Sequence, residues 1–417
     1  MKKIRVSITL GFILLLFNVF TNSVAIAKSG AKGIIEKYPA PFELKNGDRV
    51  VFIGNSLFEN DQQYGYLEFA LTSRWPDRDI TFRNLGWSGD TVFGEARSYF
   101  TNPPSAYELL VEQLTNARPT IVFVAYGGNE AVEGEAGVPR FSQGLNQLLD
   151  KIEELGARTI LFSPIPQMST GNPENLSIRN KNLELYSSAI ANTASERDLL
   201  FVDIFKPLQE ISKNSNLSDE GVHLNETGYY YLASIMEEGL GLSPRNWSVN
   251  INVSELIAEA TIPTKILNSD VDEGHIKFTV HDEFLPLPLP VHGLDRSENV
   301  RELKIRGLKR GYYSLTVDGA QVLTATAKKW SEGVEIKQGT PFTQSSQLRN
   351  RILKKNELFF HQYRPLNRTY IIGFRSYEQG RHLKGLEDLD IIIGWLEGQI
   401  GGVRMPKSNI YQLTPLK

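Results

Sequence analysis

The chain has 417 residues, more than the roughly 100–200 residues of one typical domain, which favours two structural units. It contains no cysteine, so disulfides, thiolate zinc sites and lipid attachment at an N-terminal cysteine are excluded. The formal net charge of −3 is not the strongly basic balance that favours a nucleic-acid partner.

Residues 1–27 have the three-part layout of a secretory signal peptide. Lys2, Lys3 and Arg5 precede an apolar run over 8–20, and Ala27 ends a short segment of small residues. We therefore expect cleavage after Ala27 and a periplasmic or secreted protein. The apolar run is shorter than the ~20 residues of a membrane-spanning helix, so no stable membrane span is expected after cleavage. Retention as a signal anchor is the alternative.

Cleavage would remove three basic residues and no acidic ones. The formal charge would change from −3 (45 basic against 48 acidic residues) to −6 (42 against 48). This charge argues against a nucleic-acid partner.

Short apolar runs alternate with helical patterns between Asp48 and Leu240, which is typical of a parallel sheet covered on both faces. The predicted strands are Arg49 to Ile53, Ile80 to Arg83, Thr120 to Ala125, Thr159 to Phe162 and Leu199 to Val202. They are rich in Val, Ile, Phe or Leu without polar alternation, as expected for strands buried on both sides. We predict an α/β fold, a three-layer flavodoxin-like domain over residues 28–245, with functional groups beyond the carboxyl ends of the strands.

The composition of the sequence changes after Leu242. Alternating Leu and Pro over 285–290 interrupt any helical rhythm, and several short strands with tight turns follow. The predicted strands here are Leu303 to Ile305, Tyr312 to Val317 and Gln321 to Thr326. We expect a smaller β-rich accessory region over 246–343. A helical and extended region would occupy 344–417, with a helix from Gln344 to Asn356 and then an aromatic, basic segment from Leu358 to Arg375.

Ser56 follows the first predicted strand in the segment Gly54-Asn55-Ser56-Leu57. A nucleophile at a strand-to-helix turn is exposed at the sheet edge while its N–H points out of a helix N-terminus. The alternative is that Ser56 only caps the following helix.

The next two strands also end in residues suited to a catalytic site. Gly89 lies in a glycine-containing turn that lets backbone amides approach a substrate closely. Asn129, after Gly127-Gly128, places a side-chain amide at the same edge. Each alone is compatible with an ordinary turn, but three successive strand ends carrying Ser, Gly and Asn favour a site.

His223 lies in a loop before a helix that begins near Glu226. Asp219 and Glu220 precede it by four and three residues, close enough to accept a hydrogen bond from its Nδ1 and to fix its tautomer. In chain order, the candidate residues are Ser, Gly, Asn and His.

This ordered set resembles the SGNH (GDSL-type) hydrolases. The matching blocks are Gly54-Asn55-Ser56, Gly89, Gly127-Gly128-Asn129-Glu130 and Glu220-Gly221-Val222-His223. The resemblance covers about Asp48 to Leu240 and implies a three-layer fold and ester hydrolysis through an acyl-enzyme. We expect no cofactor and no metal. The segments Phe359 to Pro365 and Phe374 to Gly380 are similar to extended bacterial members of the superfamily.

Three positions depart from the family pattern. Asn55 stands where the family has Asp, but this side chain is not the nucleophile, and Glu130 is a mild change in the third block. Glu220 stands where the acidic member of the triad is normally Asp. Three alternatives therefore remain for the group that orients His223. They are Glu220, Asp219, and a backbone carbonyl that supports a Ser-His dyad.

The sequence thus predicts that His223 removes the Ser56 proton during attack on an ester carbonyl. The backbone N–H groups of Ser56 and Gly89 and the amide of Asn129 would meet the charge on the carbonyl oxygen. We expect the substrate to be a small-molecule or polysaccharide ester, and an acylated carbohydrate in the first place. Four aromatic residues could stack on sugar rings beside Arg364 and Arg375, namely Trp330, Phe359, Tyr363 and Tyr370. The alternative is that these aromatic side chains form part of the core.

A second hypothesis is a non-catalytic glycan-binding or envelope-assembly protein that retains the hydrolase scaffold. Metal-dependent hydrolysis is less favoured, because the His and Asp residues show no ligand spacing of the usual kinds.

Overall fold

The structure is a computed structural model that describes residues 42–97, 104–169, 172–261, 264–272, 275–292, 299–365 and 382–416, together with the single residues 294, 375 and 377. The expected signal peptide lies outside these residues, as does Tyr370. Within the described ranges, no helix combines the length and the apolar character needed to cross a bilayer.

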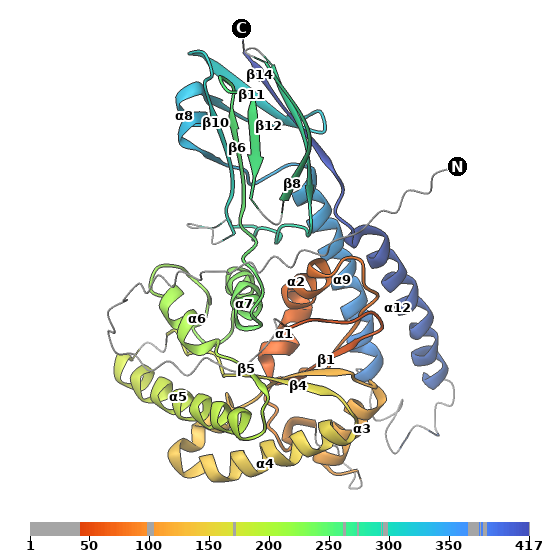
Figure 1. Cartoon of the computed structure of the whole chain (residues 1–417). Coiled ribbons are helices and arrows are strands. Elements are labelled where there is room, and N and C mark those ends of the chain that lie inside the picture. The colour runs from red at the N-terminus through yellow and green to blue at the C-terminus, as the bar shows by residue number, and fades with distance from the viewer. Residues whose placement is uncertain are drawn as a thin grey trace, which may run out of the picture. The chain divides into compact units, whose positions relative to one another are not determined.

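A five-stranded parallel sheet forms the first part of the fold (Figure 1). Its strands are β1 (Arg49–Gly54), β2 (Thr81–Asn84), β3 (Ile121–Ala125), β4 (Arg158–Phe162) and β5 (Leu200–Val202). The spatial order is β2-β1-β3-β4-β5, with every pair parallel. This is the flavodoxin-like order, which reverses direction between β1 and β3, where ligands bind in such sheets. The fold class predicted from the sequence is confirmed.

Helices cover both faces of this sheet. They are α1 (Ser56–Tyr64), α2 (Tyr66–Arg74), α3 (Ala106–Asn116), α4 (Gly134–Glu154), α5 (Pro173–Glu196), α6 (Phe205–Ile211) and α7 (Glu226–Gly239), with short 3₁₀ turns η1 (Glu95–Arg97) and η2 (Glu130–Glu133). Val50 and Phe52 of β1 pack in one apolar cluster, with residues of α1, α2 and α7. Val51 and Ile53 pack in the other, with residues of α3, α4 and α5. Alternate residues of one strand thus enter two cores, which explains the absence of polar alternation.

The chain then forms two further sheets. Their strands are β6 (Trp247–Asn252), β7 (Ile257–Ala260), β8 (Thr264–Asp272), β9 (His275–Asp282), β10 (Arg301–Arg306), β11 (Tyr312–Val317), β12 (Ala320–Thr326), β13 (Val334–Glu335) and β14 (Asn409–Pro415). One sheet has the order β13-β10-β6-β7 and the other β12-β11-β14-β9-β8. All neighbours are antiparallel except β6 and β10.

The last strand completes the second of these sheets. β14 lies between β11 and β9, so residues near the C-terminus pair with strands more than ninety positions earlier in the chain, as Gln412 does with Thr316. The sequence predicts a separate helical and extended region for these residues, which the pairing of β14 contradicts. Only the pairing of distant segments, which no local pattern records, joins them to the β-rich part.

Three helices lie between β12 and β14 in the described residues, namely α8 (Ala327–Glu332), α9 (Thr340–Tyr363) and α12 (His382–Arg404). The helix expected to end at Asn356 therefore continues to Tyr363. Its extension is stabilised by tertiary contacts, because Phe359 is buried in one of the two cores of the parallel-sheet part and Tyr363 donates a hydrogen bond to the Gly86 carbonyl.

α9 packs against the parallel-sheet part of the protein. Leu348 and Ile352 are fully buried in the cluster that contains α1, α2 and α7. Lys355 pairs with Glu68 of α2 at 2.8 Å, and both side chains are almost completely buried. The C-terminal region is therefore built into the domain that carries the predicted site.

Candidate active site

Ser56 is the first residue of α1, directly after the carboxyl end of β1. The residue that caps α1 is Asn55, whose Oδ1 accepts a hydrogen bond from the Leu57 N–H at 3.1 Å. The Asn found in place of the family's Asp thus keeps the capping acceptor. The Ser56 hydroxyl has no hydrogen-bond partner among the described residues, so the alternative in which Ser56 is merely the cap is wrong.

Glycines bring the surrounding backbone close to this turn. A Cβ at Gly54 would collide with the carbonyl oxygen of Ala125 in β3, and a Cβ at Gly86 would collide with the Glu59 nitrogen in α1. Larger residues at either position would push the second and third loops away from Ser56.

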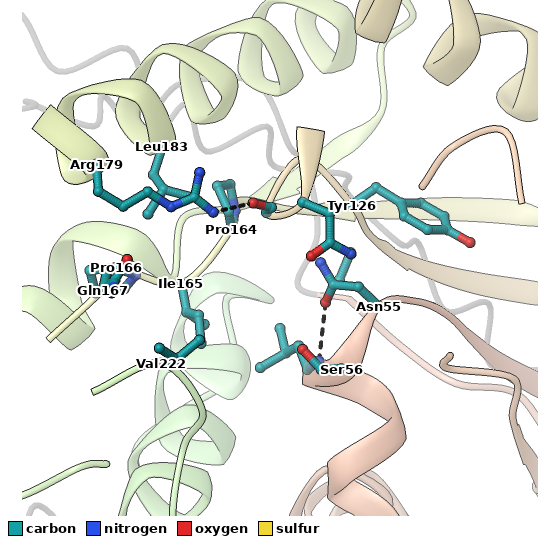
Figure 2. Close-up of a pocket in the computed structure, with 14 residues that line it drawn as sticks. Asn55, Ser56, Tyr126, Pro164, Ile165, Pro166, Gln167, Arg179, Leu183 and Val222 are labelled. Carbon is teal, nitrogen blue, oxygen red and sulfur yellow. Dashed lines mark hydrogen bonds between the residues drawn. The ribbon is translucent and has the colours of Figure 1, made fainter. Parts of the chain in front are cut away.

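A cavity with a volume of about 80 Å³ opens at the junction of β1 and β3. Its wall includes Asn129. Figure 2 shows Ser56, Leu183 of α5 and Val222, the residue before His223, in the same wall. Gly89, His223, Glu220 and Asp219 are not part of this wall. The structure therefore brings Ser56 and Asn129 together at one cavity and places the loop of His223 at its edge.

Asn129 is tied to the loop that contains Gly89. Its Nδ2 donates a hydrogen bond of 2.7 Å to the carbonyl of Asp90, the residue after Gly89. An amide nitrogen has two hydrogens, so one donor remains. Gly89 has a φ of +81°, a conformation that glycine adopts readily, and its N–H has no partner among the described residues.

A buried polar group supports the same loop. The Asp90 carboxylate accepts hydrogen bonds from Arg97 Nε at 2.8 Å and from the Tyr126 hydroxyl at 3.0 Å. The side chains of Asp90 and Arg97 are both 0% exposed. Arg97 also donates to the carbonyl of Leu85 at 2.8 Å. The two ends of the Gly89 loop are thereby fixed by one guanidinium.

Glu130 joins the second and third loops. Its Oε1 accepts from the Val92 N–H and its Oε2 from the Gly127 N–H, each at 2.9 Å. Burial raises the pKa of the Glu130 carboxyl to about 7. This residue, which departs from the family pattern, therefore has a structural role beside the site.

His223 and its two acidic neighbours make separate contacts. The Nδ1 of His223 contacts the Glu220 carboxylate, and because a carboxylate only accepts, Nδ1 carries the hydrogen. Asp219 instead accepts a hydrogen bond of 3.0 Å from Asn225, whose Oδ1 caps α7. The side chains of both His223 and Glu220 are accessible to solvent.

Several residues of the cavity are not predicted from the sequence. Pro164, Ile165, Pro166 and Gln167 follow β4 and line it, and the position of their loop at a strand end was the available signal. Arg179 reaches the cavity from α5, and one of its terminal nitrogens donates to the Gly128 carbonyl at 2.6 Å (Figure 2). The other, Nη1, is buried without a partner among the described residues. Nothing in the helical pattern marks Arg179, which is the one charged residue among the described residues of the wall.

The aromatic residues proposed as sugar platforms are mainly core. Trp330 is fully buried in the β-rich part, and Phe359, a residue of α9, is buried in a core of the parallel-sheet part. The Tyr363 hydroxyl donates a hydrogen bond to the Gly86 carbonyl. None of these three residues belongs to the cavity wall. Among the described residues, no three His, Asp or Glu side chains are grouped as metal ligands would be.

Residues 52–231 match the GDSL-like lipase/acylhydrolase family. This range contains Ser56, Gly89, Asn129 and His223. The chain carries a GDSL-like acylhydrolase domain. Its enzyme class is therefore that of the ester hydrolases.

Solved structures that are similar to the protein include BT4096 and Axe2. BT4096, a gut microbial diltiazem-metabolizing enzyme, aligns with a TM-score of 0.68 and 18% identity over 90% of this chain and 99% of that chain. Axe2, an acetylxylan esterase from Geobacillus stearothermophilus, aligns with a TM-score of 0.40 and 19% identity over 48% and 98%. At these identities the likeness concerns the fold alone, and the first alignment spans the acylhydrolase domain and the C-terminal region together. No curated protein matches the chain.

Proposed function

We propose that the protein is an exported serine esterase that removes short acyl groups, acetyl foremost, from a carbohydrate. The observation that carries the proposal is the position of Ser56. Its hydroxyl lies at the N-terminus of α1, free of the capping role that Asn55 fills, in the wall of a cavity that it shares with Asn129.

In the proposed reaction, His223 accepts the Ser56 proton as the Ser56 oxygen attacks the ester carbonyl. His223 then returns that proton to the departing alcohol, and the acyl-enzyme is hydrolysed by a water that His223 activates. The negative charge on the carbonyl oxygen is met by the N–H groups of Ser56 and Gly89 and by the second hydrogen of Asn129 Nδ2. Such hydrogen bonds between catalytic groups are often long or absent before substrate binds, in agreement with the unpartnered Ser56 hydroxyl.

We assign the orientation of His223 to Glu220. Its carboxylate contacts Nδ1, whereas the Asp219 carboxylate is engaged with Asn225. The longer side chain of Glu reaches the ring from three residues away, so Nε2 is left to accept the Ser56 proton.

The size and polarity of the cavity support a short acyl group on a hydroxyl-rich alcohol. A volume of about 80 Å³ holds a few heavy atoms, given that a single water needs about 10–15 Å³ of such space. Gln167 and Arg179 supply hydrogen-bond donors in the wall that suit hydroxyl oxygens, and Arg179 Nη1 has no partner within the described chain. Trp330 and Phe359 do not support a carbohydrate substrate, because both side chains are buried in the core.

The proposal of export rests on residues 1–27 alone. The basic residues, the apolar run and the small residues that end at Ala27 follow the pattern of a cleaved signal. N-terminal sequencing of the protein recovered outside the cytoplasm of the producing cell tests the cleavage site, and we expect the mature chain to begin at Lys28. An exported protein that still begins at Met1 would contradict the cleavage.

Covalent labelling tests the esterase itself. A fluorophosphonate should modify Ser56 of the full chain, as located by mass spectrometry, and Ser56→Ala should abolish both labelling and hydrolysis of acetylated glycans. Ser188→Ala is a matched control, because Ser188 Oγ only donates to the Glu184 carbonyl within α5. An unlabelled Ser56 in a protein that binds glycans would favour the non-catalytic scaffold instead.

A further inference from the structure

We infer that Arg364, at the end of α9, is a positioning residue for the loop that presents the Gly89 N–H. Arg364 lies outside the residues that match the acylhydrolase family. The inference rests on the proposed function, since it takes the Gly89 N–H as a donor to the substrate carbonyl oxygen.

Glu59 connects Arg364 to this loop. Glu59 belongs to α1, three positions after Ser56. One oxygen of its carboxylate accepts from Arg364 at 2.9 Å, and the other accepts from the backbone N–H of Ser88, the residue before Gly89. Both side chains of the ion pair are largely buried. A single carboxylate therefore links the nucleophile's helix, the loop and α9.

The end of α9 also contacts the two residues before Ser88. The Arg364 guanidinium lies 3.9 Å from the centre of the Trp87 ring, and Trp87 is buried. The neighbouring Tyr363 donates its hydroxyl hydrogen to the Gly86 carbonyl at 2.9 Å. Residues 86, 87 and 88 are each restrained by α9, either directly or through Glu59.

Gly89 needs such restraint because glycine has little conformational preference of its own. On its far side, Asp90 is fixed by the buried Arg97. On its near side, the Trp87 N–H donates to the Gly54 carbonyl at 2.9 Å, and the contacts of Arg364, Glu59 and Tyr363 add to this restraint. Without Arg364, the Glu59 carboxylate would lose its counter-charge. Trp87 would lose the nearer of two guanidinium groups over its ring, since that of Arg97 lies 5.1 Å from the ring centre. The Gly89 N–H would then sample positions away from the developing oxyanion, which weakens transition-state stabilisation.

α9 does not depend on Arg364 for its own attachment. Leu348, Ile352 and the ion pair between Lys355 and Glu68 are buried one or more turns earlier in the helix. Removal of the Arg364 side chain should therefore leave the fold intact and change the reaction rate. This separates a positioning role from a purely structural one.

The experiment measures kcat, KM and Tm of the full chain with an aryl acetate. Arg364→Ala should lower kcat about 10-fold or more, with KM within about twofold and little change in Tm. Arg364→Lys keeps the charge beside Glu59 but not the planar contact with Trp87, so it should recover part of the lost kcat. Lys354→Ala, which removes an exposed ion pair with Glu357 in the same helix, is the control and should retain the kcat of the wild type.

A double-mutant cycle tests the route through Glu59. If Arg364 acts through this carboxylate, Arg364→Ala should lower kcat less in a Glu59→Ala background than in the wild type. A wild-type kcat for Arg364→Ala, or a loss matched by a fall in Tm, would overturn the inference. Failure of wild-type Ser56 to react with a fluorophosphonate would instead overturn the proposed function, so the two failures are distinguishable.

Discussion

The side-chain amide of Asn129 donates a hydrogen bond of 2.7 Å to the backbone carbonyl of Asp90. This bond joins the loop after β3 to the loop after β2, and it holds Asn129 at the cavity that Ser56 also lines. The same nitrogen thus has a structural hydrogen bond and one remaining donor.

Replacing Asn129 should affect the rate more than substrate binding. Asn129→Ala removes one proposed oxyanion donor and should lower kcat by roughly 100-fold, equivalent to about 3 kcal/mol of transition-state stabilisation. Asn129→Asp has almost the same shape but no donor, so it should be impaired to a similar degree. Steady-state kinetics on an acetyl ester provide the measurement, and a fully active Asn129→Asp would exclude a donor role.

Two matched substitutions of a carboxylate by an amide test which acidic residue orients His223. Glu220→Gln removes the carboxylate that contacts Nδ1, and kcat should fall about 100-fold or more. Asp219→Asn changes the group that contacts Asn225 and should retain most of the activity. The reverse ranking would assign the role to Asp219, whereas two active variants would indicate a Ser-His dyad.

The sequence predicted the parallel sheet well, because strands buried on both faces leave distinct apolar runs between turn residues. All five predicted strands lie within two residues of the observed β1 to β5. The positions after these strands then indicated Ser56, Gly89 and Asn129 as candidate site residues, because the carboxyl ends of parallel strands lie at one edge of the sheet.

The rest of the site depends on contacts between distant segments. Arg179 and Arg364 lie on or at the end of helices whose apolar spacing says nothing about which polar residue reaches a loop elsewhere. β14 likewise has its partners far earlier in the chain. Glu130, a mild departure from the family pattern in the sequence, joins two loops through backbone N–H groups that only the folded chain brings together.

Loss of the buried Asp90 carboxylate should strongly destabilise the protein. Asp90→Ala leaves the Arg97 guanidinium buried without its counter-charge, and the free energy of unfolding should fall by about 3–5 kcal/mol. The exposed pair of Arg140 and Glu95 is the matched comparison, and Glu95→Gln should change the stability far less, because solvent screens that pair. Urea unfolding followed by circular dichroism measures both, and equal losses would contradict the burial argument.

Asp61 should make stability depend on pH. Its carboxyl is fully buried and accepts from the Tyr66 N–H at 3.0 Å, and burial raises its pKa from 3.8 to about 7. The folded state therefore holds the Asp61 proton more tightly than the unfolded state does, so this group's contribution to stability is present at low pH and is lost as pH rises from about 4 to 7.

Asp61→Asn retains the Oδ1 acceptor and cannot ionise, so the variant should not show this loss. Relative to the wild type, its free energy of unfolding should increase by up to about 4 kcal/mol between pH 4 and pH 8, because each unit of pKa shift corresponds to about 1.4 kcal/mol. Urea unfolding of both proteins across this pH range gives the difference directly. A difference that stays constant with pH would show that the Asp61 carboxyl has the same proton affinity in the folded and unfolded states.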